Sequence, residues 1–429
     1  MKPISSALRA LVTAVLCLLS AVRAGAGNAP SAADAEPLRM VMIFSRHGVR
    51  SPTDPGKLSA YAARPWPAWN TPPGYLTAHG AALMTIEGQA YRRRYAQAGL
   101  LPETGCPPAG AVFVWADVEQ RTKATADALI SGIAPSCGIL KHVADATVDP
   151  IFHALPALGK ADPIAARASV AGAIGNDPAA LVTANRAAFS ALESILGCAA
   201  GQCPAITSVP SSLSASEKTG LTSLSGPVEL GSTAVEDFIL EYADGMPMAD
   251  VGWGRVDAPT LLWLSQLHML KYIVTTETSY TATAQGSNLL ATLGATIDQS
   301  ADGKRRAQTP VPPGVRFAAF VGHDTNLETL AGMLHVSWLI PGYQPNDTPP
   351  GGALVFELYA PPSGSSGAFV RILFSAQTLD ELRSGTSLRN AAPLMVPVFL
   401  PGCPSFDCPL TTFDSVLDRA IDPRFVEHR

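Results

Sequence analysis

The sequence is poor in charge and has no excess of basic residues. Only 15% of its 429 residues are charged, with 30 Lys and Arg against 35 Asp and Glu, and the formal net charge is -5. A protein that holds a nucleic-acid backbone needs a basic surplus, so we expect no nucleic-acid partner. Internal repeats and long low-complexity tracts are also missing, so nothing indicates a solenoid or a disordered linker.

Long apolar runs are missing beyond the N-terminus, so we expect no membrane association once that segment is removed. At the start, Lys2 and Arg9 precede an apolar run over residues 10–22, which is too short to span a bilayer comfortably. Ala24-Gly25-Ala26 then fits the cleavage site of a secretory signal. We therefore expect residues 1–26 to be a signal peptide and the mature protein to be periplasmic or secreted.

Cysteine is scarce, with seven in the chain, and Cys17 falls inside the expected signal. A lipoprotein anchor at Cys17 is the weaker alternative, because Ala14-Val15-Leu16 is a poor lipobox. The other six allow fifteen disulfide connectivities, and free buried thiols are the alternative. An even count behind an export signal favours disulfides. Order along the chain suggests Cys106 with Cys137, Cys198 with Cys203, and Cys403 with Cys408. No pair has zinc-site spacing with nearby histidines, so we expect no metal.

Three short apolar runs with β-branched and aromatic members predict buried strands, at residues 38–45, 111–116 and 315–321. Residues 354–359 and 369–374 predict a later hairpin. Helical spacing of apolar residues occurs at 78–97, 119–133, 260–276 and 325–334. Strands that alternate with helices predict an α/β fold with a central, mainly parallel sheet and flanking helices.

The middle of the chain has a different composition. Residues 150–255 are rich in Ala, Ser and Leu and contain few runs typical of strands. They predict a smaller, mostly helical inserted domain that caps the edge of the sheet. The α/β catalytic core would then comprise residues 37–149 and 256–425.

Charged segments follow directly on each of the three predicted strands. They lie at residues 46–50, 117–121 and 323–324. In open α/β sheets, ligands bind outside the carboxyl ends of the strands, so these segments should meet at one edge. The group assembled there would contain Arg46, His47, Arg50, Arg121, His323 and Asp324.

Such a group suits chemistry on a phosphate monoester. Arginine offers a planar fork of donors and a permanent charge, and three arginines are more than one carboxylate needs. A neutral imidazole such as His47 can attack phosphorus and form a covalent intermediate, while the arginines compensate the anion. Asp324 is a candidate general acid for the leaving group. His323 and Thr53 could donate hydrogen bonds to the phosphate.

Plainer interpretations stand beside this one. A single histidine at a strand end is usually structural or simply exposed, and a His-Asp dipeptide is common. The full pattern R-H-G-x-R-x-x-T is rarer, with a chance occurrence of about one in ten thousand for a chain of this length. Met246 and His268 are further candidates for the pocket wall.

The motifs as a set resemble those of the histidine acid phosphatases. R-H-G-V-R-S-P-T at 46–53 is similar to the family signature, and G-H-D-T-N-L at 322–327 to its second motif. Residues 116–122, 252–255 and 345–356 resemble the bacterial periplasmic branch, which includes phytases and glucose-1-phosphatases. The resemblance is scattered over residues 38–420.

The resemblance implies a role for each matching residue. His47 would be the phosphorylated nucleophile and Asp324 the proton donor to the leaving group. The phosphate-binding residues would be Arg46, Arg50, Arg121 and His323. Thr53 and Thr325 would lie at the substrate pocket, and no cofactor would be required. The three cysteine pairs match those usual in the family.

One departure concerns the substrate. Phytases commonly have lysine after the motif threonine, whereas this chain has Asp54, which replaces a positive charge with a negative one. We therefore predict a monomeric, exported acid phosphatase that uses small phosphate monoesters and is a candidate phytase, with a glucose-1-phosphatase or another sugar-phosphate phosphatase as the alternative.

Three other functions compete with this prediction. A phosphoryl-transferring mutase is disfavoured by export, because phosphorylated metabolites are scarce outside the cytoplasm. A metal-dependent hydrolase built on His323 and Asp324 lacks further ligands at recognisable spacing. A non-catalytic phosphate-binding protein would be expected to have lost His47 or Asp324, and both are present.

Overall fold

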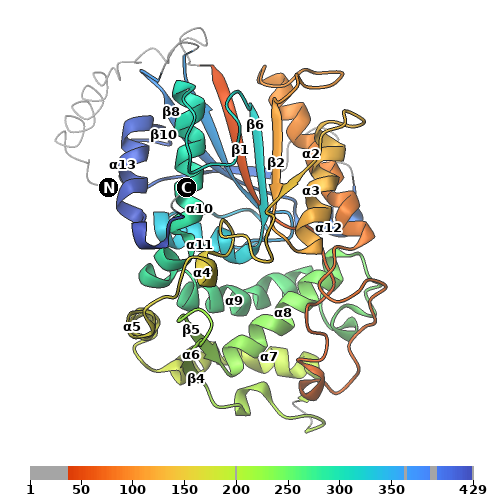
Figure 1. Cartoon of the computed structure of the whole chain (residues 1–429). Helices are drawn as coiled ribbons and strands as arrows, with labels where there is room; N and C mark the ends of the chain where they lie inside the picture. Colours follow the sequence, from red (N-terminus) through yellow and green to blue (C-terminus); the bar gives the residue numbers. More distant parts are fainter. Residues whose placement is uncertain (1–36, 199–200, 362–364, 387–393, 428–429) are drawn as a thin grey trace, which may run out of the picture. The chain divides into compact units, whose positions relative to one another are not determined.

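An eight-stranded sheet organises the part of the chain that the computed structural model describes, residues 37–198, 201–361, 365–386 and 394–427. The strand order is β10-β8-β7-β1-β6-β2-β3, and β9 pairs with β8 (Figure 1). The strands are β1 (Leu38–Arg46), β2 (Val112–Ala116), β3 (His142–Val143), β6 (Phe317–Gly322), β7 (Ala353–Tyr359), β8 (Phe369–Ala376), β9 (Leu394–Val398) and β10 (Asp407–Pro409).

The sheet has a parallel half and an antiparallel half. The neighbours β1, β6, β2 and β3 are parallel. The strands from β7 onward pair antiparallel, and β7 and β8 form the expected hairpin. The predicted α/β fold with a central sheet and flanking helices is confirmed, and its parallel half contains all three strands expected to carry the site.

Helices cover both faces of the sheet because the side chains of each strand alternate. Along β1, Val41 and Ile43 join one buried cluster, whereas Met40, Met42 and Phe44 join another. The first cluster contains residues of α2 (Ala78–Gln97) and α3 (Gln120–Ile133). The second contains residues of α10 (Ser279–Asp302), α11 (Asp324–Leu334) and α13 (Leu410–Ala420). A strand buried on both faces explains the continuous apolar run in the sequence.

Residues 150–255 are mostly helical, as their composition suggests. Their elements are α4 (Ala154–Ala157), α5 (Pro163–Ala173), α6 (Pro178–Ala184), α7 (Arg186–Leu196), β4 (Ser212–Ala215), β5 (Thr222–Ser225) and α8 (Pro227–Ala243). Figure 1 shows α7 and α8 gathered with α9 (Ala258–Thr275) beyond one end of the strands. Residues 37–429 form one compact unit, so the separate inserted domain stays a prediction. Outside residues 150–255, the short helix α12 (Leu379–Ser384) follows β8.

Three disulfides join neighbouring cysteines, and they are the pairs that order along the chain suggests. Cys106 pairs with Cys137, Cys198 with Cys203, and Cys403 with Cys408. Among the described residues, no helix is long and apolar enough to cross a membrane. The expected signal peptide at residues 1–26 lies outside the described residues.

Candidate active site

The three charged segments meet at the carboxyl ends of three neighbouring parallel strands. His47 follows β1, and its backbone N–H donates to Gly322 O at the end of β6 over 2.9 Å. Asp117 follows β2, and its N–H donates to Val321 O over 3.0 Å. These bonds extend the sheet by one residue on each side of β6. They bring the loops carrying His47, Arg121 and His323 together, as the strand pattern predicts.

The loop that carries His47 is held tightly. The carbonyl of His47 accepts from Gly351 N over 3.0 Å, and Gly48 N donates to Thr125 Oγ1 of α3 over 3.0 Å. A Cβ at Gly48 would lie 2.7 Å from Met84 Cγ and 3.2 Å from Gly80 O, so this approach to α2 requires glycine. The backbone around His47 is therefore fixed from three elements.

His47 is buried and oriented by a single hydrogen bond to its own loop. Its Nδ1 lies 2.8 Å from Gly48 O. A carbonyl can only accept, so Nδ1 carries the proton and Nε2 keeps its lone pair. Burial lowers the pKa of His47 well below its usual value, and the positive charges of Arg46, Arg121 and Arg50 lower it further. The ring is therefore a neutral imidazole whose Nε2 is available as a nucleophile.

Arg46 and Arg50 share one carboxylate partner. Arg46 donates through Nη1 to Thr348 O over 2.6 Å, and its Nη2 pairs with Glu236 Oε1. Arg50 Nη2 lies 3.3 Å from the same Glu236 oxygen. Burial lowers the pKa of Arg46, but the charges of Glu236 and Asp324 outweigh it and the net shift is upward. Glu236 therefore aims both guanidinium groups beside His47.

His323 and Arg121 form a second donor pair on the other side of His47. The His323 ring lies edge-on to that of His47, with ring centres 5.6 Å apart. Its Nε2 lies 2.7 Å from Asp117 Oδ2, and its Nδ1 lies 3.3 Å from Arg121 Nη2. Burial opposes protonation of His323, but its hydrogen bond to Asp117 and the nearby carboxylate of Glu119 raise its pKa above the usual value. The ring is thus poised to carry a second proton when an anion replaces Arg121 at Nδ1.

Asp324 begins α11 and faces the arginines. Its Oδ1 accepts from Thr325 N over 2.7 Å, and its Oδ2 lies 3.2 Å from Arg46 Nη2. Burial raises its pKa, but the charge of Arg46, with a further contribution from Arg50, outweighs burial and holds the pKa well below its usual range. A bound phosphate would add negative charge at the same arginines, and this would favour the protonated acid.

The most important residue that the sequence patterns missed is Glu236 of α8. It is buried, at 6% exposure, in a helix whose other residues are largely apolar. A buried carboxylate needs a charged or hydrogen-bonding partner. Acidic residues within an otherwise apolar helix therefore indicate a buried polar site, and this pattern could have identified Glu236. Asp117 begins the charged segment at residues 117–121, but the sequence patterns assign it no role of its own.

The remaining pocket candidates divide into two groups. His268 joins the site, with Nε2 3.5 Å from Glu236 Oε2, and Thr325 lies in the first turn of α11. Thr53 and Asp54 are exposed, and Thr53 packs against Gly74 close to Arg121. Met246 stays a prediction for the pocket wall. It follows the end of α8 and lines a separate surface cavity of about 530 Å³ with Trp69 and His79.

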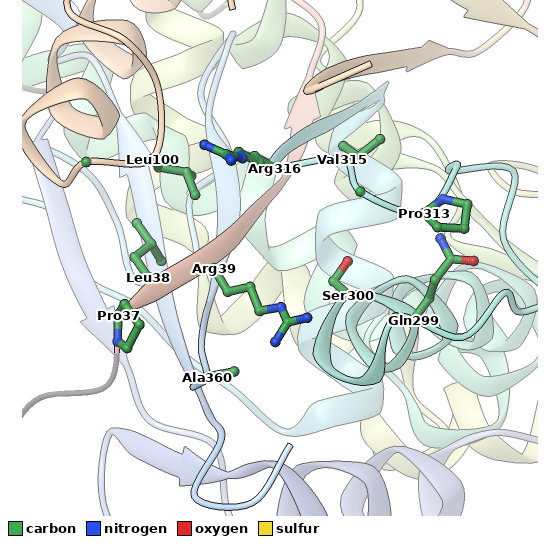
Figure 2. Close-up of a pocket in the computed structure, with 13 residues that line it drawn as sticks. Pro37, Leu38, Arg39, Leu100, Gln299, Ser300, Pro313, Val315, Arg316 and Ala360 are labelled. Carbon is green, nitrogen blue, oxygen red and sulfur yellow. The ribbon is translucent and has the colours of Figure 1, made fainter. Parts of the chain in front are cut away.

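A cavity of about 470 Å³ lies far from these residues, at the start of β1 (Figure 2). Arg39, Gln299 and Ser300 line it, and among the described residues its lining contains no histidine or carboxylate. Arg39 and Arg46 lie near opposite ends of β1 (Leu38–Arg46) and are separated by roughly 23 Å at 3.3 Å per residue. This cavity therefore lies at the opposite end of the strand from His47. Asp117, Glu119, His153 and His323 are the described residues that could hold a metal ion.

Comparison with known proteins places this geometry among phosphatases. The model of the histidine phosphatase superfamily (branch 2) matches residues 37–375. The chain is 33% identical to phytase AppA of Escherichia coli (strain K12) over 407 residues, which cover 90% of this chain and 92% of that protein. It is 27% identical to a glucose-1-phosphatase of Providencia rettgeri, covering 95% of this chain and 98% of that protein.

Solved structures agree with the sequence relatives. Hafnia alvei phytase in complex with tartrate superimposes with a TM-score of 0.85 at 33% identity, covering 92% of this chain and 100% of that one. The same phytase in complex with myo-inositol hexakis sulphate gives a TM-score of 0.83, with the same identity and coverage.

Proposed function

Because the chain belongs to the histidine phosphatase superfamily (branch 2), we propose a catalytic role for each residue gathered around His47. The protein is a phosphate-monoester hydrolase of the histidine acid phosphatase family, with phytases and glucose-1-phosphatases as relatives. One observation carries the assignment of roles. Nδ1 of His47 is bound to Gly48 O, and Nε2 is left as the lone-pair nitrogen among Arg46, Arg50 and Arg121.

In the first step, Nε2 of His47 attacks phosphorus as the bond to the leaving oxygen breaks. The arginines and His323 hold the oxygens of the transferring phosphoryl group and compensate their charge, which needs no reorganisation when the reaction occurs. Asp324 gives its proton to the departing alkoxide, so an alcohol leaves and a phosphohistidine remains.

In the second step, water attacks the phosphohistidine. Asp324, now a carboxylate, takes one proton from that water as the N–P bond breaks. Inorganic phosphate leaves, His47 is again neutral and Asp324 is again protonated. Glu236 acts as a positioning residue, because its contacts to Arg46, Arg50 and His268 aim these groups toward the phosphate.

The pH dependence of the first step provides a test of the neutral nucleophile. A histidine with an ordinary pKa of about 6.5 would lose roughly 50-fold in neutral form between pH 6.5 and 4.5. Since burial and the arginines lower the pKa of His47, we expect the burst rate with p-nitrophenyl phosphate to change less than about threefold over this range, after correction for substrate ionisation. A 50-fold loss would mean that His47 titrates normally.

We further propose that the enzyme hydrolyses a broad range of phosphate monoesters, and that negative charge at the mouth of the pocket limits its use of phytate. Asp54 is exposed, and its Oδ1 accepts from Gly56 N over 3.2 Å. Burial raises the pKa of Asp237 to about 7, and the charges of Glu236 and, to a smaller extent, Asp54 add to the shift, so Asp54 contributes negative charge at the mouth. A highly anionic substrate is repelled by such a mouth, whereas a small monoester reaches His47 with less repulsion.

Phosphate release from phytate, glucose 1-phosphate and p-nitrophenyl phosphate at acidic pH tests both the activity and this preference. For Asp54→Lys we expect kcat/KM for phytate to rise about 3- to 10-fold, with p-nitrophenyl phosphate unchanged, because a surface charge acts chiefly on a multiply charged substrate. The matched control is Asp54→Asn, which keeps the turn to Gly56 and removes only the charge. Its kcat/KM for phytate should lie between the values for the original protein and for Asp54→Lys. No change for phytate in either variant would contradict the charge argument.

We also propose that the mature protein works as a monomer outside the cytoplasm. Three disulfides over the described residues support an oxidising compartment. The substrate would be a small phosphate monoester that diffuses to the site.

A further inference from the structure

We propose that Asp117, Glu119, His153 and His323 form a binding site for one divalent transition-metal ion of the zinc type, beside the phosphate pocket. Each residue offers one ligand atom, and the four atoms lie within 4.8 Å of one another. The residues come from three separate segments, the loop after β2, the loop before α4 and the end of β6. Hydrolysis as derived above does not use this ion.

The distances between the ligand atoms fit tetrahedral coordination once the cluster expands slightly around the ion. A zinc ion with bonds of about 2.1 Å places its ligand atoms about 3.4 Å apart. Here Nε2 of His323 lies 3.5 Å from Glu119 Oε2, and Nε2 of His153 lies 4.0 Å from Glu119 Oε1. Asp117 Oδ2 is closer to the two histidines, at 2.7 and 2.8 Å. An ion held by one oxygen of each carboxylate and by the two nitrogens requires Asp117 Oδ2 to move away from each histidine by roughly 0.6 to 0.7 Å.

The present contacts leave part of this cluster unsatisfied. Nε2 of His153 and Oε2 of Glu119 are both shielded from solvent, and neither has a hydrogen-bond partner of good geometry. His153 approaches Asp117 to 2.8 Å but outside hydrogen-bond geometry. Shielded polar atoms without a partner cost free energy, which a shared cation at this point would recover.

The donor set selects the class of ion. Two imidazole nitrogens with two carboxylates suit Zn²⁺, Co²⁺ or Cu²⁺, whereas Mg²⁺ and Ca²⁺ prefer oxygen ligands throughout. Two carboxylates also balance the charge of a divalent ion, so the occupied site would be electrically neutral.

The segment that carries His153 is fixed to the same loops. The backbone N–H of His153 donates to Asp149 O over 2.8 Å, and Asp149 Oδ2 accepts from the indole of Trp115 in β2 over 2.7 Å. Asn326 of α11 donates to Phe152 O over 2.8 Å. His153 is thus held against β2 and α11, next to the loops that supply the other ligands, as a pre-organised site requires.

Binding there would alter the catalytic pocket, and this part rests on the proposed function. The ion would occupy His323 Nε2 and so break its hydrogen bond to Asp117. The orientation of a phosphate-binding ring depends on that bond. We therefore expect occupancy to slow phosphate release.

The test is titration of the EDTA-treated, dialysed protein with Co²⁺ and Zn²⁺, measured by calorimetry and by the visible absorption of tetrahedral Co²⁺. We expect one ion per chain, and at least about 10-fold weaker binding by His153→Ala. The matched control is His335→Asn, which removes an exposed histidine elsewhere and should bind as the original protein does. Equal binding by His153→Ala and the original protein, or no binding by either, would overturn the proposal.

Turnover provides a second readout. Added Zn²⁺ should slow release of phosphate by the original protein and by His335→Asn, and should slow His153→Ala only at about 10-fold higher concentration. Equal sensitivity of all three would place the inhibitory ion elsewhere and overturn the proposal. If the proposed function failed, no variant would release phosphate without metal, while the Co²⁺ titration would still decide the site.

Discussion

Replacing His47 with alanine is expected to lower kcat for phosphate-monoester hydrolysis by at least about 10,000-fold. The variant keeps the arginines and His323 that bind phosphate, but it has no nitrogen to form the covalent intermediate. The backbone at this position is held by Gly322, Gly351 and Thr125 rather than by the ring, so the fold should survive the change. Initial rates with p-nitrophenyl phosphate measure the effect.

The control for this variant is His335→Asn. His335 is exposed and has a φ of 52°, a left-handed conformation that asparagine tolerates. It should retain full activity. Inorganic phosphate should still raise the melting temperature of His47→Ala, since the arginines remain. Activity in His47→Ala within 10-fold of the original protein would remove His47 from the reaction.

Replacing Asp324 with asparagine is expected to have an effect that depends on the leaving group. Asparagine cannot donate a proton to an alkoxide, so hydrolysis of a poor leaving group such as glycerol 2-phosphate should fall about 100- to 1,000-fold. p-Nitrophenolate leaves without a proton, so p-nitrophenyl phosphate should lose less than about 10-fold in the first step. Burst and steady-state rates for both substrates separate the two steps.

The reference variant for this experiment is Glu236→Gln, which also removes a carboxylate that contacts Arg46. Because Glu236 positions the arginines and does not donate a proton, its loss should slow both substrates by similar factors. An equal loss for both substrates in Asp324→Asn would contradict its role as the general acid.

The arrangement of the catalytic group could be predicted from the sequence because it depends on local patterns. Each of three apolar runs ends in a charged segment, and parallel strands bring such ends together. This pattern alone predicts that Arg46, His47 and His323 lie at one edge of the sheet. The hairpin of β7 and β8 was equally accessible, since its two runs are adjacent in the chain.

Contacts between distant segments could not be predicted in this way. Glu236 lies 190 residues from Arg46, and only packing of α8 against the end of β1 brings their side chains together. Met246 depends on the same kind of packing: it lines a surface cavity with Trp69 and His79, and its place in the substrate pocket stays a prediction. β3 is only two residues long, too short for any periodic signal. The tautomer of His47 also depends on loop geometry that composition does not encode.

The most direct test of the account is to quench the enzyme in alkali within milliseconds of mixing it with a labelled phosphate monoester, and then to locate the label by peptide mass spectrometry. Phosphohistidine survives alkali and is lost in acid. The account predicts that the label resides on the peptide containing His47, is attached to that ring, and is absent from His47→Ala. Turnover with no phosphorylated protein, or label on another residue, would contradict it.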